Sequence, residues 1–364
     1  MMHAAISQKR KLQLKQQRKL PSSKLRRLQL NESLEGDTYP SSLEENVDIE
    51  HIPEAVPKGK FKKLDPNGRH LTNITFDLET TGLIEGHTMP QITQIAARVV
   101  DTGDVYNTYV IPTIPIGEVA SKLTGISINS SGELIANGYK KDALSIADGL
   151  QNFCDFLEKY QNPVLIAHYG LRFDFPVIVN AAKNVNKLDQ LLSCTFGCID
   201  SIRVFREAFP GQLNYKQINL AKSLLGEDYS YGAHDACEDV KALSDLLRKK
   251  EVTRNILLAH SFSFLDVCRA LMFKHEKSKN IHSLKVLVSN GIFKLPTVEN
   301  VAGSGLTLQH LITIYKRNGE DGLRSTFTQK NVADQPRVTR SNKVLDESLP
   351  KLVEFIEMSL SSTV

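Results

Sequence analysis

The chain has 364 residues, of which 41% are hydrophobic and 24% are charged, a composition typical of globular proteins with a well-buried core. Its net charge of +4 and its pI near 8.6 favour polyanionic partners. No apolar run is long enough to span a bilayer, so no membrane partner is expected, and five cysteines without a C-x-x-C pair indicate reduced thiols.

The first 70 residues are strongly segregated by charge. Residues 1–30 contain nine lysines and arginines and no acidic residue. Such a block is typical of a nuclear-import signal or a nucleic-acid-binding arm, and a solvated tail without a dedicated role is the alternative. Residues 32–54 are acidic and interrupted by prolines. We therefore expect 1–70 to be a disordered leader and linker, and the protein to be nuclear or nucleocytoplasmic, with the cytoplasm as the alternative.

The segment 71–250 alternates between strand-like and helix-like patterns. A strand ending near residue 79 and apolar, β-branched runs at 91–100 and 105–111 predict an antiparallel meander, because turn signals separate them. Two later strands, at 163–168 and 197–200, alternate with helices. The expected helices cover residues 116–123, 143–160, 175–184, 201–208, 216–225 and 235–250. This pattern predicts an α/β domain with a mixed sheet.

Two carboxylates, Asp77 and Glu79, lie at the end of the first predicted strand, and a Thr-Thr-Gly turn follows them. Side chains alternate along a strand, so both carboxylates point to the same face. Like charges on one face repel each other unless a cation lies between them, and carboxylate oxygens are ligands that Mg²⁺ and Mn²⁺ prefer. Taken alone, such a pair is more often a solvated strand end.

Two further acidic sites follow in this frame. Asp174 comes just after a buried strand at the start of a helix, where a helix N-cap is the alternative interpretation. His234 precedes Asp239 by five residues at the start of the last helix. The alternative there is a capping Asp235 beside a surface histidine.

The acidic residues and His234, in this order, resemble the motifs of the DEDDh family of 3′-to-5′ exonucleases. The flanking residues are most similar to those of the three-prime repair exonucleases. The resemblance lies in Phe-Asp-Leu-Glu-Thr-Thr-Gly-Leu at 76–83, Ala-His-Tyr-Gly-Leu-Arg-Phe-Asp-Phe-Pro at 167–176 and Cys-Ile-Asp-Ser at 198–201. It covers residues 72–250, about half of the chain. It implies a ribonuclease H-like mixed sheet flanked by helices, in an exonuclease domain at 71–250.

The resemblance also implies a role for each acidic residue. Two Mg²⁺ ions, with Mn²⁺ as a substitute, would assist the in-line displacement at a phosphodiester. Asp77 would bridge both ions, Glu79 and Asp239 would hold the one at which the attacking water is activated, and Asp174 would support the other. His234 would be the general base, because histidine changes protonation near neutral pH.

The implied substrate is a nucleic acid with a free 3′ end, and DNA is favoured over RNA. Leu83 matches the position at which the family wedges an apolar side chain against the terminal base, and Thr80 is assigned to the substrate with it; an ordinary turn or core leucine is the alternative for Leu83. An RNA exonuclease of the same fold and a catalytically weak nucleic-acid-binding scaffold stay open, and so does a homodimer. The chain departs from the family at Tyr169, where the family often has asparagine, so the hydrogen bonds near Asp174 are in doubt.

The last third of the chain is expected to be helical. Residues 251–330 predict a small helical region with helices at 252–259, 264–274, 281–290 and 306–317, and residues 331–364 predict a linker and a terminal helix. This region resembles the segment that follows the exonuclease-like region of promyelocytic leukaemia proteins. The lysines of this region indicate either contacts with a nucleic-acid backbone or a solvated helical face.

Overall fold

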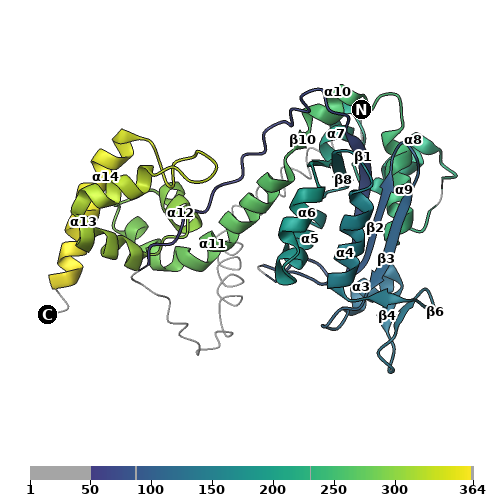
Figure 1. The fold of residues 1–364 in the computed structure, drawn as a ribbon, viewed down its shortest axis with the longest axis horizontal. Helices are drawn as coiled ribbons and strands as arrows, with labels where there is room; N and C mark the ends of the chain where they lie inside the picture. The colour runs from purple at the N-terminus through teal and green to yellow at the C-terminus, as the bar shows by residue number, and fades with distance from the viewer. Residues whose placement is uncertain (1–50, 87, 230, 362–364) are drawn as a thin grey trace, which may run out of the picture. The chain divides into compact units, whose positions relative to one another are not determined.

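The computed structural model describes residues 51–361 apart from 87 and 230, and these residues belong to one unit of the chain, Glu50–Val364 (Figure 1). The basic block at 1–30 lies outside the described residues, so its predicted role stays a prediction. None of the described helices is long and apolar enough to cross a membrane.

A seven-stranded sheet forms the centre of the first part of this unit, with the order β10-β9-β8-β1-β2-β3-β7. The antiparallel meander predicted from the sequence is confirmed, because β1 pairs antiparallel with β2 and β2 with β3. β1 also pairs parallel with β8, and β8 with β9, so the sheet is mixed. The strands are β1 Thr72–Thr80, β2 Ile92–Val99, β3 Val105–Val110, β7 Ala143–Leu144, β8 Pro163–Ala167, β9 Gly197–Asp200 and β10 Ser261–Phe262.

Helices cover both faces of this sheet, which is the ribonuclease H-like arrangement expected from the sequence (Figure 1). One face packs on α4 Ile146–Leu157, α5 Asp174–Asn184 and α6 Leu188–Cys194. The other carries α7 Ser201–Ala208, α8 Gln217–Leu225, α9 Ala236–Leu247 and α10 Arg254–Ala259. Every residue of β8 is buried, as expected for a strand between two helical layers.

A small second sheet was not predicted from the sequence. It consists of β4 Ile126–Ile128, β5 Leu134–Ala136 and β6 Tyr139–Lys140, and it follows α3 Glu118–Thr124. These strands are only two or three residues long, so they show too little alternation to be recognised. The predicted helix at 143–160 is wrong in its first residues. Ala143 and Leu144 pair with β3, and Ser145 caps α4 by accepting a hydrogen bond from the Asp148 N–H.

The C-terminal part is helical, as expected, and it has a hydrophobic core of its own. The two helices predicted at 264–274 and 281–290 are one continuous helix, because the polar run between them contains no glycine or proline to interrupt it. Gly319 has a positive φ of 61° inside α13 and kinks that helix instead of ending it. The helices are α11 Phe264–Ser289, α12 Leu295–Gly303, α13 Leu308–Thr328 and α14 Asn342–Ser361.

The segment from 51 to 64 contacts both parts although it has almost no regular structure. The Val56 N–H donates to the Ser304 carbonyl at 3.3 Å, and the Lys60 N–H donates to Asp266 Oδ1 at 3.2 Å. The Phe61 ring meets the Phe262 ring edge-on at 5.2 Å. The predicted linker boundary at residue 70 stays a prediction, but these contacts place 51–64 against the folded unit.

Candidate active site

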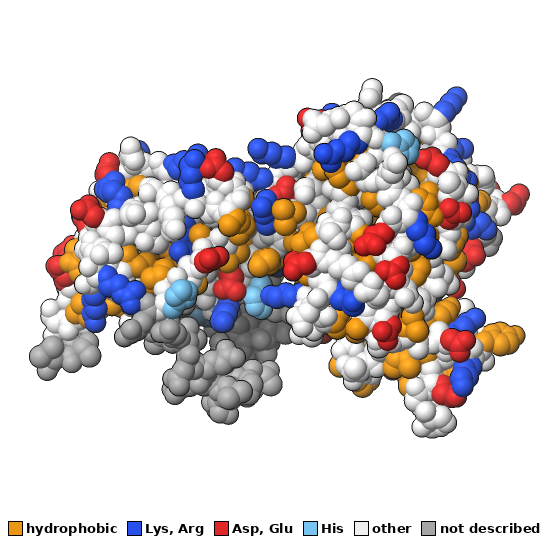
Figure 2. All heavy atoms as spheres, viewed as in Figure 1, with side chains coloured by type: hydrophobic (Ala, Val, Ile, Leu, Met, Phe, Trp, Pro, Cys, Tyr) orange, Lys and Arg blue, Asp and Glu red, His pale blue; other side chains and the backbone are white. Residues whose placement is uncertain are grey.

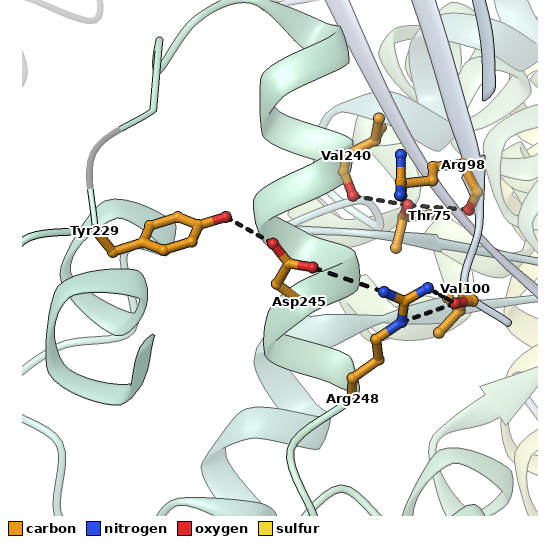
Figure 3. Close-up of polar contacts among 7 residues, drawn as sticks. All are labelled: Thr75, Arg98, Val100, Tyr229, Val240, Asp245 and Arg248. Carbon is orange, nitrogen blue, oxygen red and sulfur yellow. Dashed lines mark hydrogen bonds and ion pairs between the residues drawn. The ribbon is translucent and has the colours of Figure 1, made fainter. Parts of the chain in front are cut away.

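β1 separates its apolar and its acidic residues by face. Ile74, Phe76 and Leu78 are buried in the core against α4 and α5. The Thr75 hydroxyl, on the opposite face, donates to the Val240 carbonyl of α9 at 2.9 Å and lies 3.1 Å from the Arg98 carbonyl (Figure 3). Asp77 and Glu79 follow Thr75 at the period of two, so they face α9 as the alternation predicts.

The helix α9 brings the third carboxylate, Asp239, to this face. Asp77, Glu79 and Asp239 each offer a carboxylate oxygen within 4.8 Å of the other two, although Asp239 lies far from β1 in the sequence. Two side-chain contacts anchor α9 further along. Arg248 donates from Nε to the Val100 carbonyl at 2.9 Å, and Asp245 Oδ2 accepts from the Tyr229 hydroxyl at 2.8 Å (Figure 3).

Asp174 joins the cluster from α5. Its side chain is only 3% exposed, and its Oδ1 accepts a hydrogen bond at 3.2 Å from the backbone N–H of Leu78, the residue between Asp77 and Glu79. β8 pairs with β1 only as far as Thr75, so this N–H needs a partner beyond the last strand pair. Asp174 therefore supplies that partner and is held beside the two β1 carboxylates.

The clustered carboxylates raise one another's pKa. Burial, with the charges of Asp174, Asp239 and Glu79, raises the pKa of Asp77 well above its usual range. Burial and the charge of Asp239 raise the pKa of Glu79 to about 9. Burial likewise raises the pKa of Asp174 to about 7 and that of Asp239 to about 6, although backbone hydrogen bonds lower both. Four anionic groups so close together are costly without a compensating cation.

The donor set fits a hard divalent cation. All four residues are carboxylates. Among the described residues, the group within 4.8 Å consists of Asp77, Glu79 and Asp239 and includes no cysteine or histidine side chain. Oxygen-only sets are typical of Mg²⁺, Mn²⁺ and Ca²⁺ sites, whereas zinc sites commonly include sulfur or nitrogen. Asp77, Glu79, Asp174 and Asp239 are therefore the residues that would hold divalent ions.

We expect the stability of the metal-free protein to fall as the pH rises from about 4 to about 9. In the unfolded chain, aspartate and glutamate lose their protons near pH 4. The folded state retains protons on Asp174 and Glu79 up to pKa values of about 7 and about 9. Since the folded state then binds more protons than the unfolded state, unfolding becomes easier with increasing pH.

Thermal unfolding in EDTA from pH 5 to pH 9 measures this effect, and the same series in excess Mg²⁺ is its control. The metal-bound carboxylates should stay ionised, so the control curve should be flatter. Identical pH profiles with and without Mg²⁺ would contradict the assignment of these groups to a cation site.

His234 lies beside Asp239 but is not locked in place by its side chain. Its backbone N–H donates to Asp239 Oδ2 at 2.8 Å, and its φ of 71° is in the left-handed region, which non-glycine residues rarely adopt. The side chain is exposed. Asp235 does cap α9, because its Oδ1 accepts from the Cys237 N–H at 2.9 Å. The structure therefore places His234 next to Asp239, and its catalytic role stays a prediction.

The two residues predicted to contact the substrate differ in exposure. Leu83 is 76% exposed, so the alternative of a core leucine is excluded. Thr80 is buried, and its hydroxyl donates to the Gly82 carbonyl at 2.7 Å, which closes the turn after β1. Thr80 therefore shapes the backbone that presents Leu83, and any contact of either residue with a substrate stays a prediction.

Several groups around the carboxylates were not singled out from the sequence. Gln217 Nε2, from α8, donates to Asp239 Oδ1 at 3.1 Å and to its carbonyl at 2.9 Å. Burial and the charge of Asp239 raise the pKa of Tyr231, whose hydroxyl also contacts Asp239. Gln94, opposite Glu79 in β2, donates to Asp235 Oδ1 at 3.2 Å. No motif marks these residues, because amides and phenols in loops and helices carry no pattern of their own.

His168 and Tyr169 precede Asp174 in the sequence and differ in their contacts and exposure. His168 Nε2 donates to the Tyr215 carbonyl at 2.8 Å, and Nδ1 accepts from the Ser201 hydroxyl at 2.8 Å. Burial lowers the pKa of His168, which favours this neutral form. Tyr169 has a φ of 65° and a half-exposed side chain. Asp174 Oδ1 accepts its hydrogen bond from Leu78 of β1, so the departure at Tyr169 leaves this anchoring contact intact.

Comparison with known families finds a match for each of the two parts of the chain. Residues 74–247 match the exonuclease family RNase_T, and residues 280–355 match the family described as PML, C-terminal domain. The sheet-containing part of the chain is thus similar to exonucleases, and the helical part that follows is similar to the C-terminal domain of PML. The resemblance inferred from the sequence is confirmed.

Individual proteins are similar to parts of this chain. The chain is 26% identical to mouse protein PML over 217 residues, which are 59% of this chain and 23% of PML. It is 31% identical to the PolC-type DNA polymerase III of Caldanaerobacter subterraneus over 182 residues, 48% of this chain and 11% of the polymerase. The chain thus covers less than a quarter of either relative. An Escherichia coli ExoI structure in complex with single-stranded DNA aligns with 63% of this chain and 46% of ExoI, at 17% identity and a TM-score of 0.40.

Proposed function

We propose that this protein is a metal-dependent DEDDh-type exonuclease that removes nucleotides from the 3′ ends of DNA. The observation that carries the proposal is the convergence of Asp77, Glu79 and Asp239 within 4.8 Å, with Asp174 tied to the same strand. A surface that only bound nucleic acid would gain nothing from four carboxylates, because they repel a phosphate backbone.

The carboxylates hold the ions and thereby convert a repulsive site into one that accepts a phosphodiester. Two divalent ions would supply Lewis-acid chemistry here, by neutralising the phosphate and by making water a stronger nucleophile. Asp77, Glu79 and Asp239 would hold the ions with their clustered carboxylates, and Asp174, tied to the same strand, would support them. Gln217 and the His234 N–H restrain Asp239 by donating to its two carboxylate oxygens at 3.1 Å and 2.8 Å.

His234 acts as the general base in this proposal. Its side chain is exposed, and its backbone N–H donates to Asp239 Oδ2, so His234 is the histidine that the chain places next to a proposed metal ligand. The ring takes a proton from the attacking water and returns it to solvent. Leu83, exposed on the turn after β1, packs against the terminal base.

Activity should require Mg²⁺ or Mn²⁺ and should stop in excess EDTA, since the ligands are all oxygen donors. The measurement uses purified protein and oligonucleotides of DNA and of RNA, labelled in separate samples at the 3′ or the 5′ end. Attack from the 3′ end releases a labelled mononucleotide at once from the 3′-labelled strand and gives a ladder from the 5′-labelled strand. Undiminished digestion in EDTA would show that the metal assignment is wrong.

The same assay decides between the alternatives. Faster digestion of RNA than of DNA would identify an RNA exonuclease of the same fold. Binding of both without turnover, in either metal, would identify a scaffold. Nuclear or nucleocytoplasmic localisation and a homodimer stay proposals, and the basic block on which the localisation rests lies outside the described residues.

A further inference from the structure

A groove between α5 and α11 lies next to the candidate active site and is lined by positive and amide groups. It encloses about 200 Å³ and is walled by α5, α11 and the connection from β1 to β2. Its polar lining consists of Lys183, Asn180, Asn184, Lys274 and His275, and no carboxylate belongs to it. Apolar surface comes from Met89, Val179 and Met272.

Two elements of the chain contribute both to the candidate active site and to the groove wall. α5 begins at Asp174 and carries Lys183 nine residues later, which is about 13 Å along the helix axis. The connection after β1 carries the exposed Leu83 at one end and Met89, in the groove wall, at the other. A strand whose last nucleotide lies at the carboxylates therefore meets the groove a short distance upstream.

The two lysines of the groove have no ion-pair partner among the residues that the structure describes. Lys183 and Lys274 are exposed, and neither forms an ion pair with another described residue. By contrast, Lys277 on the same helix is paired with Glu299 at 3.2 Å. On the face drawn in Figure 2, blue lysine or arginine and pale-blue histidine side chains lie close together where Figure 1 draws α5 and α11.

We propose that this groove binds the single-stranded segment immediately 5′ of the nucleotide at the active site. The inference rests on the proposed function and adds to it the form of the substrate, a single-stranded 3′ tail. Lys183 and Lys274 contact phosphates, Asn180 and Asn184 donate hydrogen bonds to phosphate oxygens, and the methionines pack against a base.

The test compares two charge-matched double variants. Lys183→Gln with Lys274→Gln removes the groove charges. Lys62→Gln with Lys250→Gln removes two exposed lysines outside the groove lining that likewise form no ion pair with a described residue. Both change the net charge by two, so a non-specific effect of charge appears in both. Thermal unfolding confirms that each variant folds.

Binding is measured first, because it does not depend on turnover. Fluorescence anisotropy follows a labelled single-stranded 12-mer in Ca²⁺, which occupies oxygen ligands. The groove variant should bind about tenfold more weakly than wild type, and its log-log dependence on salt should flatten by about 1.4 for two lost phosphate contacts on a single strand. The control variant should stay close to wild type. Equal weakening in both variants, or in neither, overturns the inference.

Cleavage separates failure of the groove from failure of the active site. On whichever 12-mer the wild type digests faster, DNA or RNA, the groove variant should show a KM about tenfold higher with an unchanged kcat. Cleavage of a dinucleotide, which is too short to reach Lys183, should be unaffected. If the wild type cleaves no substrate, the proposed function fails while the binding comparison still decides on the groove. A wild type that digests blunt duplex faster than a single strand overturns the inference.

Discussion

Asp77→Asn is expected to reduce cleavage by about 10³-fold or more and, at the same time, to stabilise the metal-free protein. Asp77 is the only carboxylate that would contact both ions, so its loss removes several kcal/mol of transition-state charge stabilisation. Its folded-state pKa is raised by burial and by four neighbouring carboxylates. The amide removes that repulsion, so the free energy of unfolding in EDTA at pH 8 should increase.

The two effects require separate measurements. Single-turnover cleavage in Mg²⁺ reports the chemical step, isothermal titration reports metal affinity, and thermal unfolding in EDTA reports stability. Asp101→Asn, at an exposed turn after β2, is the matched control and should change none of the three. If Asp77→Asn destabilises the metal-free protein, the carboxylate has a structural partner. The interpretation that these carboxylates repel one another in the absence of a cation would then be wrong.

His234→Ala is expected to slow cleavage by about 10²–10⁴-fold, the usual range for loss of a general base. Metal affinity should stay close to that of the wild type, because the carboxylates remain and the contact to Asp239 Oδ2 comes from the His234 backbone. The loop should also keep its position, since the Tyr229–Asp245 and Gln217–Asp239 contacts do not involve the imidazole.

His70→Ala is the matched control for this experiment, because His70 is an exposed histidine that precedes β1. Three outcomes distinguish the possible roles of His234. Slow single-turnover cleavage with normal metal titration supports the general base, and loss of metal affinity identifies a ligand. An unchanged rate would identify a surface histidine beside a helix cap and would refute the assignment.

Local patterns predicted most of the sheet and its flanking helices. The meander, the buried strand β8 and the helices α5, α7 and α9 lie within a few residues of their expected positions. The predictions failed where strand pairing in the folded protein overrides a local sequence pattern. Ala143 and Leu144 look like the start of the helix that follows them, but they complete the edge of the sheet beside Tyr109 and Val110.

The segment 51–64 makes contacts that its composition does not indicate. Its prolines and acidic neighbours are typical of a linker, and its composition contains no periodicity. Its backbone groups nevertheless bond to Ser304, Asp266 and Ser261, because hydrogen bonds to a main chain need no particular side chain at the donor. Amino-acid composition reflects the side chains of a segment, whereas these hydrogen bonds are donated by its backbone N–H groups.

The sequence by itself determined which residue types the candidate site contains and how the first pair is arranged. Asp77 and Glu79 share a face because side chains alternate along every strand, and this geometry is local. The order of the later acids indicated a resemblance but not a distance.

Only the tertiary structure decided that four carboxylates meet. Asp239 reaches β1 because the Thr75 hydroxyl bonds to the Val240 carbonyl across 165 positions of sequence, and Asp174 reaches it because Leu78 has an unpaired N–H beyond the end of β8. The same packing brought Gln217 and Tyr231 to Asp239 and Lys183 close to Lys274. Repulsion within such a cluster arises only when chain segments far apart in sequence are held together, because electrostatic interaction depends on distance in space. The need for a compensating cation follows from that repulsion.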